Sequence, residues 1–100
     1  MQAYTVEDEE LVEKLSALGH IYRLQIVTAL TEREKYLSEI AKEVGISRAL
    51  ANVHLKKLRE AGLVKTRVLL LEDEARALRY YELNDFHIEL SPEELKRRKK

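Results

Sequence analysis

The chain of 100 residues contains no cysteine, so disulfide bonds, thiolate metal sites and thiol redox chemistry are excluded. It also lacks an apolar run near the roughly 20 residues that span a bilayer, and the acidic start at Glu7–Glu10 differs from a signal peptide. We therefore expect a cytoplasmic protein with no membrane partner. A single proline and 45% hydrophobic residues suit one domain over residues 1–100, which can fold without metal or disulfide support.

The sequence also lacks the patterns on which enzymes depend. No serine or threonine stands in a recognisable pattern with an orienting base, and no glycine-rich phosphate loop is present. The histidines, His20, His54 and His87, are too few and too scattered to predict a metal site. We expect no enzyme activity, no metal and no cofactor. Because His54 lies beside a stripe of core residues, we interpret it as a partly buried, hydrogen-bonded packing residue.

The chain also has no net charge, because its 18 basic and 18 acidic side chains balance. Only the distribution of charge can therefore support binding to a polyanion. Residues 37–67 hold seven Lys or Arg against three Asp or Glu, whereas residues 1–36 hold four against seven and residues 68–100 seven against eight. Charged residues reach 36%, and Asn and Gln together number only four, a bias typical of heat-adapted proteins. The positive charge lies in the middle of the chain.

Four segments place apolar residues at the three- and four-residue spacing of amphipathic helices. They cover residues 6–18, 20–30 and 37–44, and a segment that begins at the N-cap Ser47 and runs to about Ala61. In the second segment the apolar face is broad enough for a central core helix. The apolar faces of the last three segments comprise Ile21, Leu24, Ile26, Val27, Leu30, Leu37, Ile40, Ala41, Val44, Ala51, Leu55 and Leu58.

The last two helices are joined by a very short turn. Gly45 ends the third helix by accepting a left-handed conformation, and Ser47 caps the fourth. Ala41 is small enough to let the neighbouring helix approach, while Ala51 packs inward. The spacing predicts a helix-turn-helix over residues 37–61.

After Gly62 the pattern changes from helix to strand. Residues 63–71 and 77–83 are rich in Val, Leu, Thr and Tyr and flank a polar stretch, which predicts a hairpin, or wing, over residues 63–83. Alternation at Phe86, Ile88 and Leu90 suggests a brief further strand, and Ser91-Pro92 starts a short basic helix over residues 91–100. The predicted fold is mainly α with a small antiparallel β-hairpin, a winged helix-turn-helix.

Two stretches within roughly residues 11–83 resemble the ArsR-like winged-helix repressors. Residues 18–27, LGHIYRLQIV, are similar to the family's entry into its second helix. Residues 46–64, ISRALANVHLKKLREAGLV, are similar to its recognition helix and the strand leading into the wing. The resemblance implies a homodimeric repressor that binds double-stranded DNA and places one recognition helix per subunit in successive major grooves. No pattern indicates an effector.

The resemblance also implies a dimer interface that the first helix, within residues 1–18, forms together with the terminal helix. Its alternative is ordinary packing within one chain. The expected interface residues are Leu11, Val12, Leu15 and Leu18.

On a helical wheel, one side of the recognition helix lies opposite the buried stripe. There Arg48 can reach guanine or phosphate, and Asn52 can pair with adenine through both groups of its amide. Ala49 and Val53 are placed to contact thymine methyl groups. For each basic residue the alternative is a solvated surface charge, so the case is collective. Phosphate contacts are expected from Ser47, Lys56, Lys57, Lys65, Arg67, Arg76 and Arg79.

The wing departs from what a phosphate-binding hairpin requires. Its tip contains Glu72, Asp73 and Glu74, which repel a phosphate backbone, so the tip points away from DNA, or Arg76 and Arg79 alone make the contact, or another partner binds. Residues 68–71 are apolar on both faces and need a cover. The candidates are the segment 86–90, the dimer mate, and a ligand or protein. The alternative function is therefore a winged-helix module for protein interaction that binds little DNA.

Overall fold

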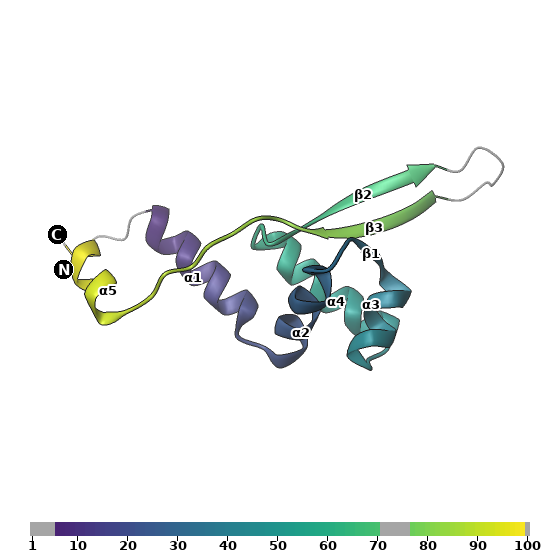
Figure 1. Ribbon diagram of the computed structural model, residues 1–100, viewed down its shortest axis with the longest axis horizontal. Helices are drawn as coiled ribbons and strands as arrows, with labels where there is room; N and C mark the ends of the chain where they lie inside the picture. Colours follow the sequence, from purple (N-terminus) through teal and green to yellow (C-terminus); the bar gives the residue numbers. More distant parts are fainter. Residues whose placement is uncertain (1–5, 71–76, 100) are drawn as a thin grey trace.

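A computed structural model of the chain describes residues 6–70 and 77–99. Within these residues the helices surround one side of a small antiparallel sheet, and the hairpin extends beyond them at one end of the molecule (Figure 1). This arrangement confirms the predicted winged helix-turn-helix. The elements are α1 (Val6–Leu18), α2 (Ile21–Leu30), β1 (Lys35–Tyr36), α3 (Leu37–Val44), α4 (Arg48–Glu60), β2 (Val64–Leu70), β3 (Ala77–Leu83) and α5 (Pro92–Arg98). None of the helices seen in this part of the chain is both long and apolar enough to cross a bilayer.

The helix ends confirm the predicted signals. Gly45 follows α3 at φ 80°, and Gly62 follows α4 at φ 76°, a conformation that residues with a Cβ adopt only at a cost. The Ser47 hydroxyl accepts a hydrogen bond from the backbone N–H of Leu50 at 3.1 Å, which fixes the start of α4. The turn between α3 and α4 is as short as the sequence predicted.

The core forms where α4 packs against α2, α3 and the start of β2. Ala51, Leu55 and Leu58 of α4 are completely buried, as the helical spacing predicted. The broad apolar face expected for α2 is only partly correct, because Ile21 and Leu24 are exposed. The neighbouring helices cover the side of α2 that carries Ile26, Val27, Ala29 and Leu30 and leave the other side open. The remaining buried hydrophobic residues are Ala17, Ile40, Ala41, Leu63, Val64 and Tyr81.

The sheet contains a strand that the sequence did not reveal. The order is β1-β3-β2, with Lys35 opposite Tyr81 and Tyr36 opposite Tyr80. The sequence predicted only a polar connection before α3, because a strand of two residues is too short to show alternation. Lys35 is buried, and its ammonium group pairs with Glu43 at 3.0 Å and Glu32 at 3.2 Å. These two ion pairs compensate the buried positive charge of Lys35 in β1, an edge strand of the sheet.

The strand expected over residues 86–90 is wrong. The backbone N–H of Asn84 donates to the carbonyl of Leu63 and its side chain donates to the carbonyl of Gly62, both at 2.9 Å, at the point where strand pairing ends. Since β2 begins at Val64, residues 86–90 have no strand to pair with. Phe86 instead packs against the core. The segment runs back along α1 to α5, the predicted basic helix, which ends at Arg98 (Figure 1).

His54 fills the space between α4 and α2, as predicted for a packing residue. Its side chain is 6% exposed, its Nδ1 lies 3.1 Å from Nη1 of Arg23, and its ring centroid lies 4.5 Å from that of His20. Arg23 also donates to the carbonyl of Ala17 at 2.6 Å and so ties α2 to the end of α1. Burial, followed by the charges of His20, Arg23 and Lys57, lowers the pKa of His54.

We predict that the protein loses stability as the pH falls below about 6.5, because of His54. A histidine with a lowered folded pKa is neutral in both states above about pH 6.5, and below that value the unfolded chain takes up the proton first. The free energy of unfolding should then fall by up to about 1.4 kcal/mol per pH unit. Urea denaturation at fixed protein concentration measures the loss. His54→Gln should flatten the dependence and the exposed His87→Gln should keep it; an equal slope in both variants would contradict the assignment.

Candidate nucleic-acid interface

The side of α4 opposite its buried stripe faces outward. Four side chains on this side are exposed to solvent: Arg48, Ala49, Asn52 and Val53, of which Val53 is 52% exposed. Lys56 continues the same side one turn further. A helix turns by about 100° per residue, so burial of Ala51, Leu55 and Leu58 directs these side chains away from the core. The orientation agrees with the helical wheel, whereas their contacts with bases remain a prediction.

An open groove of about 690 Å³ lies between the first turns of α3 and α4 and the hairpin. Arg48, Ala49 and Asn52 line it from α4, and Val68 and Arg79 line it from the hairpin. The structure therefore brings together three of the predicted base-reading residues and one predicted phosphate contact that is 31 positions away from Arg48 in the sequence. In the part of the chain that the structure covers, no carboxylate pairs with Arg48 or Arg79.

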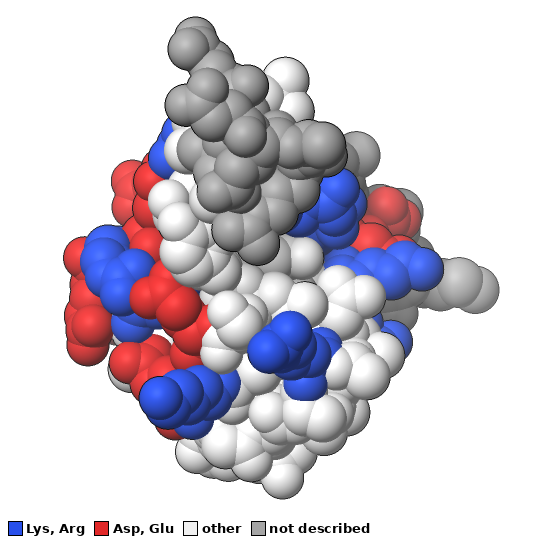
Figure 2. All heavy atoms as spheres, turned by 90° about the vertical axis from the view of Figure 1, so that its right-hand side faces the viewer, with Lys and Arg blue, Asp and Glu red and all other residues white. Residues whose placement is uncertain are grey.

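The two faces of the hairpin have different surroundings. Opposed residues in the register share a face, so Val68 with Arg79 and Thr66 with Tyr81 lie on the side of the helices. Lys65 and Arg67, two of the predicted phosphate contacts, alternate with them and lie on the other face. Figure 2 looks onto this end of the molecule: an uncharged surface with a few separate basic side chains occupies its lower part, and most of the acidic surface lies to the left.

Arg67 is paired within the protein. Its Nε donates to Oε2 of Glu34 at 3.2 Å, and its Nη2 donates to the other carboxylate oxygen. The guanidinium carbon lies 4.9 Å from the centroid of the Tyr80 ring. Hydrogen bonding to Arg67 lowers the pKa of Glu34 below its usual value, so this carboxylate stays ionised.

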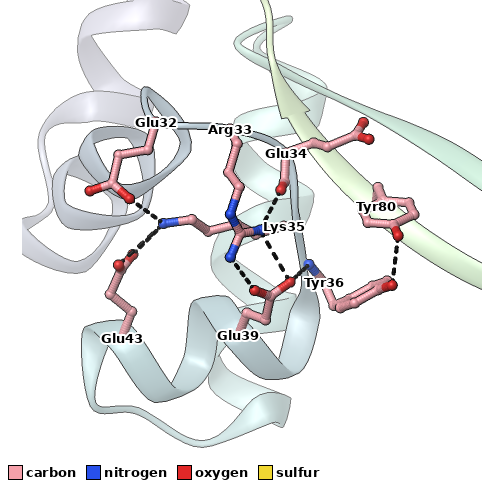
Figure 3. Close-up of polar contacts among 8 residues, drawn as sticks. All are labelled: Glu32, Arg33, Glu34, Lys35, Tyr36, Glu39, Glu43 and Tyr80. Carbon is pink, nitrogen blue, oxygen red and sulfur yellow. Dashed lines mark hydrogen bonds and ion pairs between the residues drawn. The ribbon is translucent and has the colours of Figure 1, made fainter.

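These contacts continue into a closed circuit, the wing clamp, drawn in part in Figure 3. The hydroxyl groups of Tyr80 and Tyr36 lie 2.6 Å apart and their rings stack with centroids 4.4 Å apart. The backbone N–H of Tyr36 donates to Glu39 at 3.1 Å, Arg33 pairs with Glu39 at 2.5 Å, and Arg33 donates to the carbonyl of Glu34 at 2.9 Å. The wing clamp comprises Arg33, Glu34, Tyr36, Glu39, Arg67 and Tyr80.

The wing clamp escaped sequence analysis because its members come from separate segments. Tyr36 and Tyr80 are 44 positions apart, and Glu34 and Arg67 are 33 apart. Hydrogen bonding to Arg33 and to the Tyr36 backbone lowers the pKa of Glu39, while the hydrogen bond to Tyr80 raises the pKa of the Tyr36 phenol. The one related signal in the sequence is the presence of Tyr80 and Tyr81 in the predicted strand 77–83.

The other predicted site residues are spread more widely. Lys57 lines a hollow between α1 and α4 together with Arg23, on the side of α4 away from Arg48. Ser47 is exposed while its hydroxyl caps α4, and Arg76 lies outside the described residues. Across residues 6–70 and 77–99, no group of three or more His, Asp or Glu side chains could hold a metal ion.

The residues assigned to a dimer interface fall into two groups. Val12 and Leu15 are exposed, at 61% and 37%, whereas Leu11 is half-buried and Leu18 packs against the core of its own chain. Arg98 of α5 forms an ion pair with Asp8 of α1, so the two helices meet at the end of the molecule opposite the hairpin (Figure 1). There Leu90 and Leu95 add exposed apolar surface.

Among the described residues of the wing, three neighbouring apolar side chains on β2 are uncovered. Val68, Leu69 and Leu70 are 50%, 36% and 76% exposed. The segment 86–90, one of the covers expected for them, runs in the opposite direction toward α1 (Figure 1). An intrachain cover from that segment is therefore excluded.

A protein-family model and a related protein that match this chain both describe regulatory proteins. The family described as "Bacterial regulatory protein, arsR family" matches residues 22–66. An uncharacterized HTH-type transcriptional regulator of Methanocaldococcus jannaschii is 32% identical over 88 residues, which are 88% of this chain and 90% of the relative.

Two solved structures are similar in fold and sequence. The transcriptional repressor BigR from Xylella fastidiosa aligns with a TM-score of 0.65 and 30% identity, over 82% of this chain and 83% of its own. A homodimeric winged helix-turn-helix DNA-binding domain from Mycobacterium bovis aligns with a TM-score of 0.65 and 25% identity, over 83% and 75%.

Proposed function

Because the chain belongs to the ArsR family of bacterial regulatory proteins, we propose that it is a transcriptional regulator that binds double-stranded DNA at specific sequences. The observation that carries the proposal is the groove in which Arg48, Ala49 and Asn52 of α4 face Arg79 of the hairpin. Arg48 and Asn52 offer the donors and acceptors that read guanine and adenine in the major groove. Arg79 offers a positive charge to the phosphate backbone of the DNA beside the groove.

We further propose a homodimeric repressor. The repressor role is supported by the similarity to BigR, and the dimer by the homodimeric relative from M. bovis. The helices α1 and α5, which carry the exposed side chains of Val12, Leu15 and Leu95, lie on the side of the molecule away from the hairpin, so a twofold contact through them leaves both recognition helices free. We place this DNA-binding regulator in the cytoplasm.

Binding to duplex DNA at graded salt tests the function. A duplex enriched from a random-sequence pool should contain two inverted half-sites whose centres lie about one helical turn apart. Its affinity, measured by fluorescence anisotropy, should fall steeply as salt rises, because each neutralised phosphate releases counterions. If the protein shows no salt-dependent binding to duplex DNA at low ionic strength, the proposal is wrong. Such a result would favour a protein-interaction module, for which the exposed Val68, Leu69 and Leu70 are the supporting observation.

Within α4 we predict separate effects for base-reading and phosphate-binding residues. Arg48→Ala or Asn52→Ala should cost about 1–3 kcal/mol on the selected duplex and relax the preference at single positions. Lys56→Ala should weaken all duplexes alike and reduce the salt slope by about 1. Affinities for a panel of single-base operator variants measure both effects. Uniform weakening by all three substitutions would show that base reading is misassigned.

For the dimer we predict that Val12→Glu yields a monomer. The side chain is 61% exposed in one chain, so the substitution should leave the fold intact while placing a charge in an apolar interface. Sedimentation velocity gives the mass, and the matched control is Leu70→Glu, at an apolar side chain 76% exposed at the far end. A dimer that persists in Val12→Glu, or a monomer in both variants, would place the interface elsewhere.

A further inference from the structure

The hairpin leaves the body of the protein at the wing clamp. Arg67 and Tyr80 are opposite one another in the register, and the next pair toward the tip is Val68 and Arg79. Closer to the body, Val64 and Tyr81 are buried in the core, whereas Val68 and Leu70 are exposed. Among the described residues, Arg67 and Tyr80 thus make the outermost hydrogen bonds and ion pairs between the hairpin and the body, one position before the pair that lines the groove.

The wing clamp joins the hairpin to the start of the helix-turn-helix. Glu34 precedes β1, and Tyr36 is the N-cap of α3, whose first turn lines the groove. Arg67 contacts Glu34 through two donors, and Tyr80 stacks on Tyr36. A planar guanidinium that is both paired and stacked has a defined orientation. Any swing of the hairpin over the groove must break these contacts together.

Arg67 is also poorly placed to neutralise phosphate. It lies on the face of the hairpin away from the groove, and leaving Glu34 would expose an unpaired carboxylate next to a polyanion. Arg79, by contrast, lines the groove and pairs with no carboxylate in the part of the chain described. The two arginines of the wing therefore differ in surroundings although both carry one positive charge.

We propose that Arg67 is a positioning residue, which together with Glu34 holds the hairpin over the groove so that Arg79 meets the DNA backbone. The inference rests on the proposed function for its DNA readout. It replaces the expectation that Arg67 itself binds phosphate. It assigns Glu34, an acidic residue, a favourable role in binding a polyanion.

Four variants separate positioning from direct contact on the selected duplex. Glu34→Gln and Arg67→Gln should each weaken binding by up to about fivefold, as expected for the loss of one exposed ion pair. The salt slope should stay at the wild-type value in Arg67→Gln and fall by about 0.9 in Arg79→Gln. The exchanged pair Glu34→Arg with Arg67→Glu keeps the net charge and should recover affinity.

Several results would overturn the inference. If Arg67 binds phosphate, Glu34→Gln releases it and tightens binding, Arg67→Gln lowers the salt slope, and the exchanged pair fails to recover. Variants that melt earlier but bind normally would show a purely structural role. Failure of the wild-type protein to bind any duplex would remove the DNA-binding proposal itself, and the role of Arg67 in binding with it.

A measurement without DNA tests the positioning directly. Because the chain has no cysteine, spin labels can be attached at Leu70→Cys on the hairpin and Lys56→Cys on α4. The distance distribution between the labels should be narrow in the otherwise unchanged protein and broad after Arg67→Gln or Glu34→Gln. Lys65→Gln, a charge change on the same strand outside the wing clamp, should keep it narrow. An unchanged width in Arg67→Gln would overturn the inference even if DNA binding is confirmed.

Discussion

The burial of one face of α4 is the constraint on which the DNA-binding surface depends. Ala51, Leu55 and Leu58 have no exposed surface, and each large side chain contributes about 1.5–3 kcal/mol by leaving water. Rotation of α4 would expose them and cost several kcal/mol, so the helix has one orientation. Because a helix is stiff, the directions of Arg48 and Asn52 follow from residues that never touch DNA. The Ser47 cap fixes where that helix begins.

Local pairing explains how a chain of zero net charge can present a basic groove. Two acids near the base of the hairpin are paired with bases of the same protein: Glu34 with Arg67, and Glu39 with Arg33. The lowered pKa values of both carboxylates mean that these pairs stay ionised, so their charges largely cancel at a distance. Arg48 and Arg79 are left without such partners among the described residues. The field at the groove therefore depends on the arrangement of charges rather than on their sum.

Periodicity predicted the elements and the outward face of α4, because helices and long strands repeat a signal over many residues. It failed where structure depends on contacts between distant segments. β1 has two residues and exists only because Lys35 and Tyr36 meet β3, and the pairing of Arg67 with Glu34 joins positions 33 apart. The strand expected at residues 86–90 had the right alternation but no neighbour to pair with. Alternation signals a capacity for pairing, and topology decides whether a partner is present.

The division of α4 into a buried and an exposed side has a consequence for evolution. Substitutions at exposed positions such as Ala49, Asn52 and Val53 change stability by only about 0.5 kcal/mol, whereas the buried stripe tolerates few changes. A lineage can therefore alter the DNA sequence it recognises in single steps, each leaving a folded protein. The wing, held by its own contacts with the body, keeps its position through such changes. One scaffold can thus diverge into regulators of unrelated genes without passing through unfolded intermediates.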